Sequence, residues 1–284
     1  MITFFTIPRQ FTNLHNIIQS NAILSWKEIK PECEIIVFSD HSSISSFCDK
    51  NNIKHIDNFE INSFGTPILS DIWKKAKKHS KYDTLCYINT DIILFPDFYR
   101  NLQKVKLDKY LLAGRRWDLN IDYHIDFSSK WFFSLKDEIH KKGNLHPVTG
   151  VDFFLFPKTL MPKMPPFAIG RAWWDNWLLT HFLNKKIPLI DGTYITSVHQ
   201  NHDYNHIKSV STNTTNKGLE REKNQSLANL KNWQIKDISD CTHILSKSGV
   251  KKMPFYLRFR RILVRNIFGF LSYYKKKIVT LFST

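Results

Sequence analysis

The stretch that decides the fold is LCYINTDIILFPDF, residues Leu85–Phe98. Its apolar residues are typical of a buried strand, and three polar residues, Asn89, Thr90 and Asp91, interrupt them. An acid at the tip of a buried strand gives up hydration unless a partner compensates for the loss. We therefore expect Asp91 to face a metal ion or a sugar hydroxyl, and a plain turn is the alternative.

The segments before this stretch alternate between strand and helix patterns. The predicted strands are ITFFTIP (2–8), CEIIVFSD (33–40) and IKHI (53–56), and the predicted helices cover residues 14–26, a short segment from Ser43, and a segment that begins near Thr66 and Pro67. This order predicts an α/β fold with a mainly parallel sheet, right-handed crossovers and helices on both faces.

Polar residues and chain breaks follow three of the predicted strands. Pro8, Asp40 and the triplet Asn89–Asp91 each stand at the carboxyl end of a strand. Ligands of open parallel sheets bind at this edge. We therefore expect the three segments to converge on one crevice, which favours a binding role for Asp91 over a plain turn.

The chain lacks the usual glycine-rich phosphate loops. It has nine glycines, and it contains neither G-x-G-x-x-G nor G-x-x-x-x-G-K. A nucleotide diphosphate bound here would need its charge neutralised in another way. A divalent cation held by Asp91, Mg²⁺ or Mn²⁺, would do so, because these ions take one or two carboxylates together with substrate phosphates.

The charge of the chain is unevenly distributed. The formal net charge is +16, and ten of the basic residues lie between Lys247 and Lys277, where no acid remains. We predict a body of residues 1–246 and a basic tail of residues 247–284.

Four cysteines without metal-ligand spacing indicate reduced core thiols, and the N-terminus shows no standard secretion signal. We therefore expect a cytoplasmic protein without membrane spans.

Six successive blocks resemble one enzyme family. FGTPILSDI, YINTDIIL, AGRRWDLNI, TGVDFFLFP, PPFAIGRAWWDNWL and HQNHDYNH together cover about residues 2–250 and resemble bacterial GT-A-fold glycosyltransferases, which are often associated with surface polysaccharides. In this resemblance Asn89-Thr90-Asp91 stands at the D-x-D position, with an amide in place of the first acid. In that family the last acid of the triplet, here Asp91, is the more regular metal ligand.

The resemblance implies transfer of a sugar from a nucleotide-diphosphate sugar to a hydroxyl of a glycan or lipid-linked acceptor. It places Thr6, Pro8 and Asp40 at the nucleotide, Asn89 and Asp91 at the Mn²⁺ or Mg²⁺ ion and the diphosphate, and Asp152 at the sugars. Arg115 and Arg116 follow another predicted strand and could hold a diphosphate, or pair with Asp118 or Asp122. For Asp152, a structural turn cap is the alternative.

Asp175 is the candidate general base, because it opens a predicted helix in IGRAWWDNWLL. A sugar hydroxyl is a poor nucleophile, and a positioned carboxylate can remove its proton. A plain helix cap is the alternative role of this acid. The neighbouring Trp173 and Trp174 could stack on sugars or belong to the core.

Three histidines, His199, His202 and His206, follow a predicted strand, IPLIDGTYITSV. Neutral imidazole ligates divalent metals, so His199 and His202 are metal or supporting candidates, with a structural role as the alternative. Their spacing does not match a zinc site. The polar segment from Ser209 to Gln225 is predicted to be a loop.

The tail carries an amphipathic helix pattern. Its apolar residues recur at three- and four-residue spacing beside a basic stripe of Arg258, Arg261 and Arg265, and they are Phe259, Ile262, Leu263, Ile267, Phe270, Leu271 and Tyr274. This pattern favours docking on an anionic membrane surface, with packing on the body as the alternative.

Two rival functions are open at this stage. A sugar nucleotidyltransferase would share the fold but is expected to carry a glycine-rich basic loop after its first strand, and IPRQFTNLHN has no glycine. A nucleic-acid-binding module would explain the charge, but the basic excess lies in the tail, so no nucleic-acid partner is expected.

Overall fold

The computed structural model describes residues 1–202, 218–231, 234–264 and 267 of the chain. Some residues named in the sequence analysis lie outside the described residues. They are His206, the first part of the predicted loop 209–225, Arg265, Phe270, Leu271 and Tyr274.

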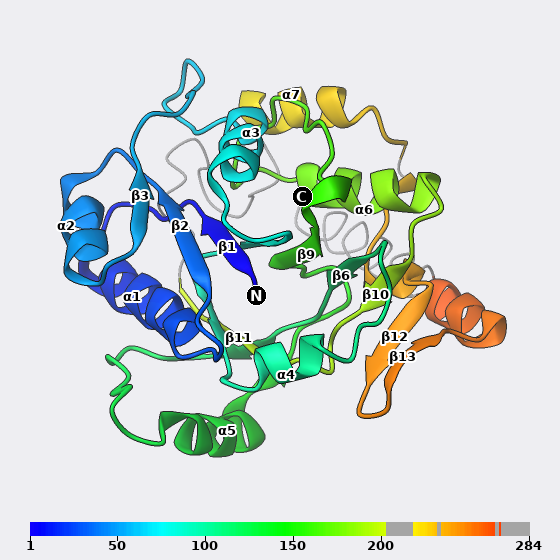
Figure 1. The fold of residues 1–284 in the computed structure, drawn as a ribbon. Coiled ribbons are helices and arrows are strands. Elements are labelled where there is room, and N and C mark those ends of the chain that lie inside the picture. Colours follow the sequence, from blue (N-terminus) through cyan, green and yellow to red (C-terminus); the bar gives the residue numbers. More distant parts are fainter. Residues whose placement is uncertain (203–217, 232–233, 265–266, 268–284) are drawn as a thin grey trace, which may run out of the picture.

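A large twisted sheet forms the centre of the molecule (Figure 1). Its strands lie in the order β13-β12-β10-β6-β9-β4-β1-β2-β3, and all of them run parallel except β9 and β13. The predicted fold class, α/β with a mainly parallel sheet, is confirmed. The bounds are β1 Thr3–Thr6, β2 Glu34–Phe38, β3 Lys54–Ile56, β4 Thr84–Ile88, β6 Leu111–Ala113, β9 Phe153–Pro157, β10 Leu189–Asp191, β12 His243–Ser246 and β13 Gly249–Lys252.

Helices cover both faces of this sheet because its central strands are apolar on both sides. One core packs α3 (Leu69–His79), α6 (Trp174–Asn184) and the end of α7 (Leu219–Ala228) on one face. The other core packs α1 (Asn13–Lys27), α2 (Ser42–Lys50) and α4 (Phe98–Leu102) on the opposite face. Within the described residues, short 3₁₀ helices also lie at Lys158–Leu160 and Ile238–Asp240.

A second, smaller sheet explains how distant segments meet. It has the order β5-β11-β7-β8, with β5 Ile92–Leu94, β7 Trp117–Leu119, β8 Asn144–Leu145 and β11 Ser197–Gln200. Helix α5 (Trp131–Lys142) covers it with a core of its own. In the register of this sheet, His199 pairs with Ile92 on one side and with Asp118 on the other. The small sheet therefore brings His199 next to the end of β4.

Several element predictions differ from the structure. The predicted strand through Leu85–Leu94 is two strands in two sheets, and IPLIDGTYITSV likewise splits into β10 and β11. The helix near Thr66 begins three residues later, at Leu69, because Ile68 is extended and bridges to Ala168. The predicted loop 209–225 contains the start of α7, a polar helix that buries only Asn224 and Ala228.

The central sheet runs past the predicted body of residues 1–246. Strand β13 pairs with β12 through Lys252, so the first six residues assigned to the tail complete a hairpin at the sheet edge. Residues 255–264 then form a helix. Within the described part of the chain, no helix is long and apolar enough to cross a bilayer.

Candidate functional site

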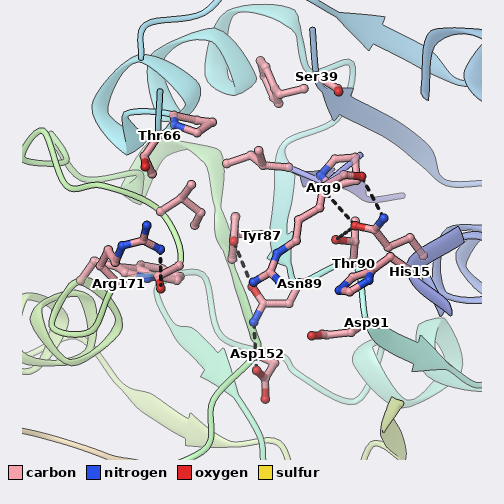
Figure 2. Close-up of a pocket in the computed structure, with 18 of the residues that line it drawn as sticks. Arg9, His15, Ser39, Thr66, Tyr87, Asn89, Thr90, Asp91, Asp152 and Arg171 are labelled. Carbon is pink, nitrogen blue, oxygen red and sulfur yellow. Dashed lines mark hydrogen bonds between the residues drawn. The ribbon is translucent and has the colours of Figure 1, made fainter. Parts of the chain in front are cut away.

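The carboxyl ends of the strands form a cleft of about 730 Å³. Figure 2 shows its lining, with polar side chains from both halves of the sheet pointing inward. The cleft gathers most of the residues that the sequence singles out, namely Pro8, Asp40, Asn89, Asp91, Asp152, Asp175, His199 and His202. Two of them, Thr6 and Arg115, do not line it.

Asp91, His199 and His202 form an acid–histidine cluster at the base of the cleft. The Asp91 Oδ2 atom lies 3.2 Å from His202 Nε2 and 3.5 Å from His199 Nε2. The three potential ligand atoms lie within 4.8 Å of one another. Asp91 Oδ1 is buried and makes no hydrogen bond within the described part of the chain. One carboxylate with a spare oxygen and two imidazoles suit a divalent cation such as Mn²⁺.

The charges of this cluster reinforce one another. Burial alone would raise the pKa of Asp91, but the hydrogen bonds and charges of His199 and His202 outweigh it and lower the pKa of the carboxyl. Burial would also lower the pKa of His199, and Asp91 reverses that effect and raises it. In the absence of a cation, the cluster therefore holds a carboxylate beside a readily protonated imidazole.

Asp118 lies directly behind His199. Its Oδ1 is 3.4 Å from His199 Nδ1, on the side of the ring opposite Asp91, and Asn201 Oδ1 lies 3.3 Å from the same nitrogen. The other oxygen, Oδ2, is 2.6 Å from His146 Nδ1. A carboxylate that faces the second ring nitrogen fixes the orientation and basicity of a metal-binding histidine. The sequence predicts for Asp118 only a possible ion pair with an arginine.

Arg116 joins this carboxylate to a second one. Its Nε donates to Asp118 Oδ1 at 3.0 Å, and its Nη1 is paired with Asp152 Oδ2. Arg116 lines the cleft, whereas Arg115 turns away and donates to the backbone oxygen of His146 at 2.7 Å. The cleft-facing arginine is thus the second of the pair, because successive residues after β6 point in opposite directions.

The Asn89 side chain hydrogen-bonds to two other side chains of the cleft. Its amide Nδ2 donates to Asp152 Oδ1 at 2.9 Å, and its Oδ1 accepts from the Tyr87 hydroxyl at 3.0 Å (Figure 2). The amide therefore fixes Asp152 at the cleft, a task that a carboxylate would perform poorly beside another carboxylate.

Asp175 is the second residue of α6 and lines the cleft. Its Oδ1 is buried and has no hydrogen-bond partner among the described residues. Burial, aided by the charge of Asp152, raises the pKa of the Asp175 carboxyl to about 6, although backbone N–H groups at the helix start oppose the shift. Trp174 lines the cleft beside it, while Trp173 is buried away from it. A half-buried carboxyl with a pKa near neutrality is suited to accept a proton.

The opposite end of the cleft is built on the strand end of β1. The Thr6 hydroxyl donates to the Ile88 backbone oxygen at 2.6 Å, so Thr6 ties β1 to β4 beneath the cleft instead of lining it. Pro8 forms part of the wall, and Asp40, with a side chain 63% exposed, stands at the rim.

Several basic side chains in the cleft escaped the sequence analysis. Figure 2 shows Arg9 extending across the cleft toward Asn89, with His15 beside Asp91 and Arg171 on the far wall. Arg171 also pairs with Glu220 of α7 at 2.6 Å. Arg9 follows Pro8 directly, so its place after a predicted strand is a signal that could have predicted Arg9 at the cleft. His15 and Arg171 lie on elements whose packing the sequence does not reveal.

No protein-family model and no curated protein matches the chain. Three similar solved structures are a mannosyltransferase, PcManGT, from Pyrobaculum calidifontis in complex with GDP-Man and Mn²⁺, a mycobacterial protein, and S. aureus TarS 1–349. In this order, their TM-scores are 0.47, 0.41 and 0.39, and their identities are 10%, 13% and 14%. Each match covers 72% of this chain, but only 58%, 69% and 59% of the other chain.

Proposed function

We propose that the protein is a glycosyltransferase that moves a sugar from a nucleotide-diphosphate sugar to a hydroxyl of a glycan or lipid-linked acceptor. The observation that carries this proposal is the presence of two separate acidic centres in one polar cleft. Asp91 belongs to the acid–histidine cluster, and Asp175 stands alone with a pKa raised to about 6. Two carboxylates in such different surroundings suit two different roles.

The acid–histidine cluster would hold Mn²⁺ or Mg²⁺ through Asp91, His199 and His202. A bound cation supplies charge that neutralises a diphosphate and stabilises it as a leaving group. Asp118 orients His199, and Arg116 anchors Asp152 beside the same region. Arg9 and Arg171 offer further positive charge in the cleft, and guanidinium groups bind phosphates well.

Asp175 would act on the acceptor. The acceptor oxygen attacks the anomeric carbon, its proton passes to the Asp175 carboxylate, and the bond between the anomeric carbon and the diphosphate oxygen breaks. The nucleoside diphosphate leaves with the electron pair of that bond. Because this geometry requires base and leaving group on opposite sides of the sugar, it favours inversion at the anomeric carbon. Asp152, held by Asn89 and Arg116, would contact the donor sugar.

The proposed setting is the cytoplasmic face of a membrane. A lipid-linked acceptor would place the reaction there, and the basic tail would keep the enzyme at the surface as a peripheral protein. Surface polysaccharide synthesis is the pathway that the sequence resemblance favours. Residues 1–246, with the β13 strand that completes the sheet edge, would form the catalytic domain.

The test is a turnover screen against nucleotide sugars with and without Mn²⁺. We expect one donor to release nucleoside diphosphate in a metal-dependent way, and Asp91→Ala to abolish the release. Asp122→Ala is the matched control, because Asp122 is exposed and does not line the cleft. Pyrophosphate release from a sugar phosphate and a nucleoside triphosphate would instead identify a nucleotidyltransferase, and the proposal would be wrong.

A further inference from the structure

The C-terminal helix, residues 255–264, contacts the body through its charged side. The Arg261 guanidinium donates to Asp191 Oδ2 at 2.7 Å, and Asp191 is almost fully buried at the end of β10. Ile262 and Arg258 on the same side are partly buried. Figure 1 shows the helix, in orange, at the edge of the molecule beside β12 and β13. The Arg261–Asp191 ion pair therefore fixes the helix in one orientation on the sheet.

The other side of this helix is apolar and exposed. Phe255 and Phe259 are 80% and 57% exposed, and their rings stack with centroids 6.3 Å apart. Residues four apart lie on the same side of a helix, so the exposed apolar side chains form one continuous surface. This surface, called here the apolar face, consists of Phe255, Tyr256, Phe259, Leu263, Val264 and Ile267.

The apolar face is unusual because it is continuous. Single exposed apolar residues are ordinary, but a contiguous patch marks a surface that another partner covers. The sequence pattern placed Ile262 in the outward apolar stripe and Arg261 on the membrane-binding stripe. The structure instead turns Ile262 inward and uses Arg261 on the body.

The charges around the apolar face select the partner. Arg260 is exposed on the same helix, Lys251 and Lys252 are exposed at the end of β13, four and three residues before the helix, and no acid follows Asp240 in the chain. A second copy of the protein would bring two positive surfaces together, which is unfavourable. An anionic bilayer offers both an apolar layer for the aromatic side chains and negative headgroups for the lysines and arginine.

We infer that the apolar face docks the protein on an anionic lipid surface, with Lys251, Lys252 and Arg260 contacting the headgroups. The Arg261–Asp191 pair holds the docking helix rigidly on the body. The value of this arrangement for a lipid-linked acceptor rests on the proposed function, but the docking itself does not.

Vesicle flotation of the full chain tests the inference. Wild type, the double variant Phe255→Ser/Phe259→Ser and the control Phe133→Ser are compared on vesicles of phosphatidylcholine alone and with phosphatidylglycerol. Phe133 lies on α5 and is 57% exposed, as Phe259 is, so its replacement removes an exposed phenylalanine of equal exposure elsewhere on the molecule. We expect the double variant to bind the anionic vesicles at least about tenfold more weakly than wild type, and the control to bind like wild type.

A charge variant, Lys251→Gln/Lys252→Gln/Arg260→Gln, tests the electrostatic part. We expect it to lose the preference for anionic over neutral vesicles. Equal flotation of wild type and the aromatic variant, or equal binding of wild type to both vesicle types, would overturn the inference. So would a dimer in light scattering that the aromatic substitutions dissociate, because the face would then be a subunit contact.

The two proposals can fail separately. Nucleotide-sugar binding by the aromatic variant should equal that of wild type, since the apolar face does not line the cleft. Vesicle binding without any nucleotide-sugar binding would leave the docking surface in place and reject the glycosyltransferase. Nucleotide-sugar turnover without vesicle binding would support the glycosyltransferase and reject the docking surface.

Discussion

Asp175 lowers the stability of the protein at neutral pH, because burial disfavours its charged form. Its pKa is raised from 3.8 to about 6, so the folded protein binds a proton there more tightly than the unfolded chain does. The contribution of this group to stability is therefore largest below about pH 4 and is lost as the pH rises through about 6. At neutral pH the buried carboxylate opposes folding.

We predict that Asp175→Asn separates stability from turnover. At about pH 7 the variant should be more stable than wild type by on the order of 2 kcal/mol, because a charge leaves a half-buried site. Turnover should fall by about 10²-fold or more, while donor binding is unchanged. Urea unfolding, donor titration and nucleotide release measure the three quantities. A combined loss of donor binding and turnover would show that Asp175 binds the donor or only caps the helix.

The same carboxyl should set the acid limb of the pH profile. We expect kcat for the wild type to fall below about pH 6, by about tenfold for each further unit, because a protonated base cannot accept the acceptor proton. An acid without the burial of Asp175 would shift that limb toward its ordinary range near about pH 4. Steady-state rates between about pH 4.5 and 8, with enzyme integrity checked at each pH, would decide between these two outcomes.

Asp118 is expected to act through His199 and not on the substrate. Asp118→Ala should weaken Mn²⁺ binding by about tenfold or more, since the imidazole loses its charged partner at Nδ1 and keeps only the Asn201 side chain there. Asp118→Asn should recover part of the affinity, because an amide oxygen can still accept from Nδ1. Calorimetric titration with Mn²⁺ measures this, with Asp122→Ala as the control. Unchanged Mn²⁺ affinity in Asp118→Ala would limit Asp118 to pairing with Arg116 and His146.

At the scale of elements, helix α1 fastens two strand ends at the cleft. The Gln19 side chain, 3% exposed, accepts from the Arg9 backbone N–H at 2.7 Å and donates to the Arg9 backbone oxygen at 2.9 Å. The Thr90 hydroxyl donates to the same amide oxygen at 3.2 Å. One side chain thus holds the loop after β1 against the turn after β4.

We predict that Gln19→Leu destabilises the protein by about 2 kcal/mol, because the part-buried backbone N–H and oxygen of Arg9 lose their partner. Nucleotide binding should weaken as well, since Arg9 and the Asn89–Asp91 turn lose their common support. The comparison is Gln103→Leu, an exposed glutamine at the end of α4, which should change stability by less than about 0.5 kcal/mol. Equal stability of the two variants in thermal unfolding would argue against this fastening role.

The sequence predicts the main sheet well because its strands are continuous apolar runs that alternate with helices. It predicts the second sheet poorly because β5 and β11 pair across more than a hundred residues, and periodicity carries no record of such a pairing. The site shows the same limit. Strand ends in the sequence predict that Pro8, Asp40 and Asp91 lie at the cleft. Which of Arg115 and Arg116 faces the cleft depends instead on the direction of the backbone after β6. Asp118 lies at the site only because β7 pairs with β11 opposite His199.

At the scale of the whole molecule, the candidate site and the excess positive charge lie in different parts of the chain. The cleft combines acids with several cationic side chains, while the unbalanced positive charge lies beyond Asp240. This separation is expected of an enzyme that binds a small anionic donor in one place and a surface in another. A nucleic-acid-binding protein would instead spread its basic residues over the face of the body.

The central claim is that Asp91 anchors a cation that binds the diphosphate of the donor. The most direct measurement is the affinity for a nucleoside diphosphate, with and without Mn²⁺, in wild type, Asp91→Ala and Asp122→Ala. We expect Mn²⁺ to tighten binding by about tenfold or more in wild type and in Asp122→Ala, a coupling of about 1.4 kcal/mol, and to have no effect in a folded Asp91→Ala. The same Mn²⁺ dependence in Asp91→Ala as in wild type would contradict the account.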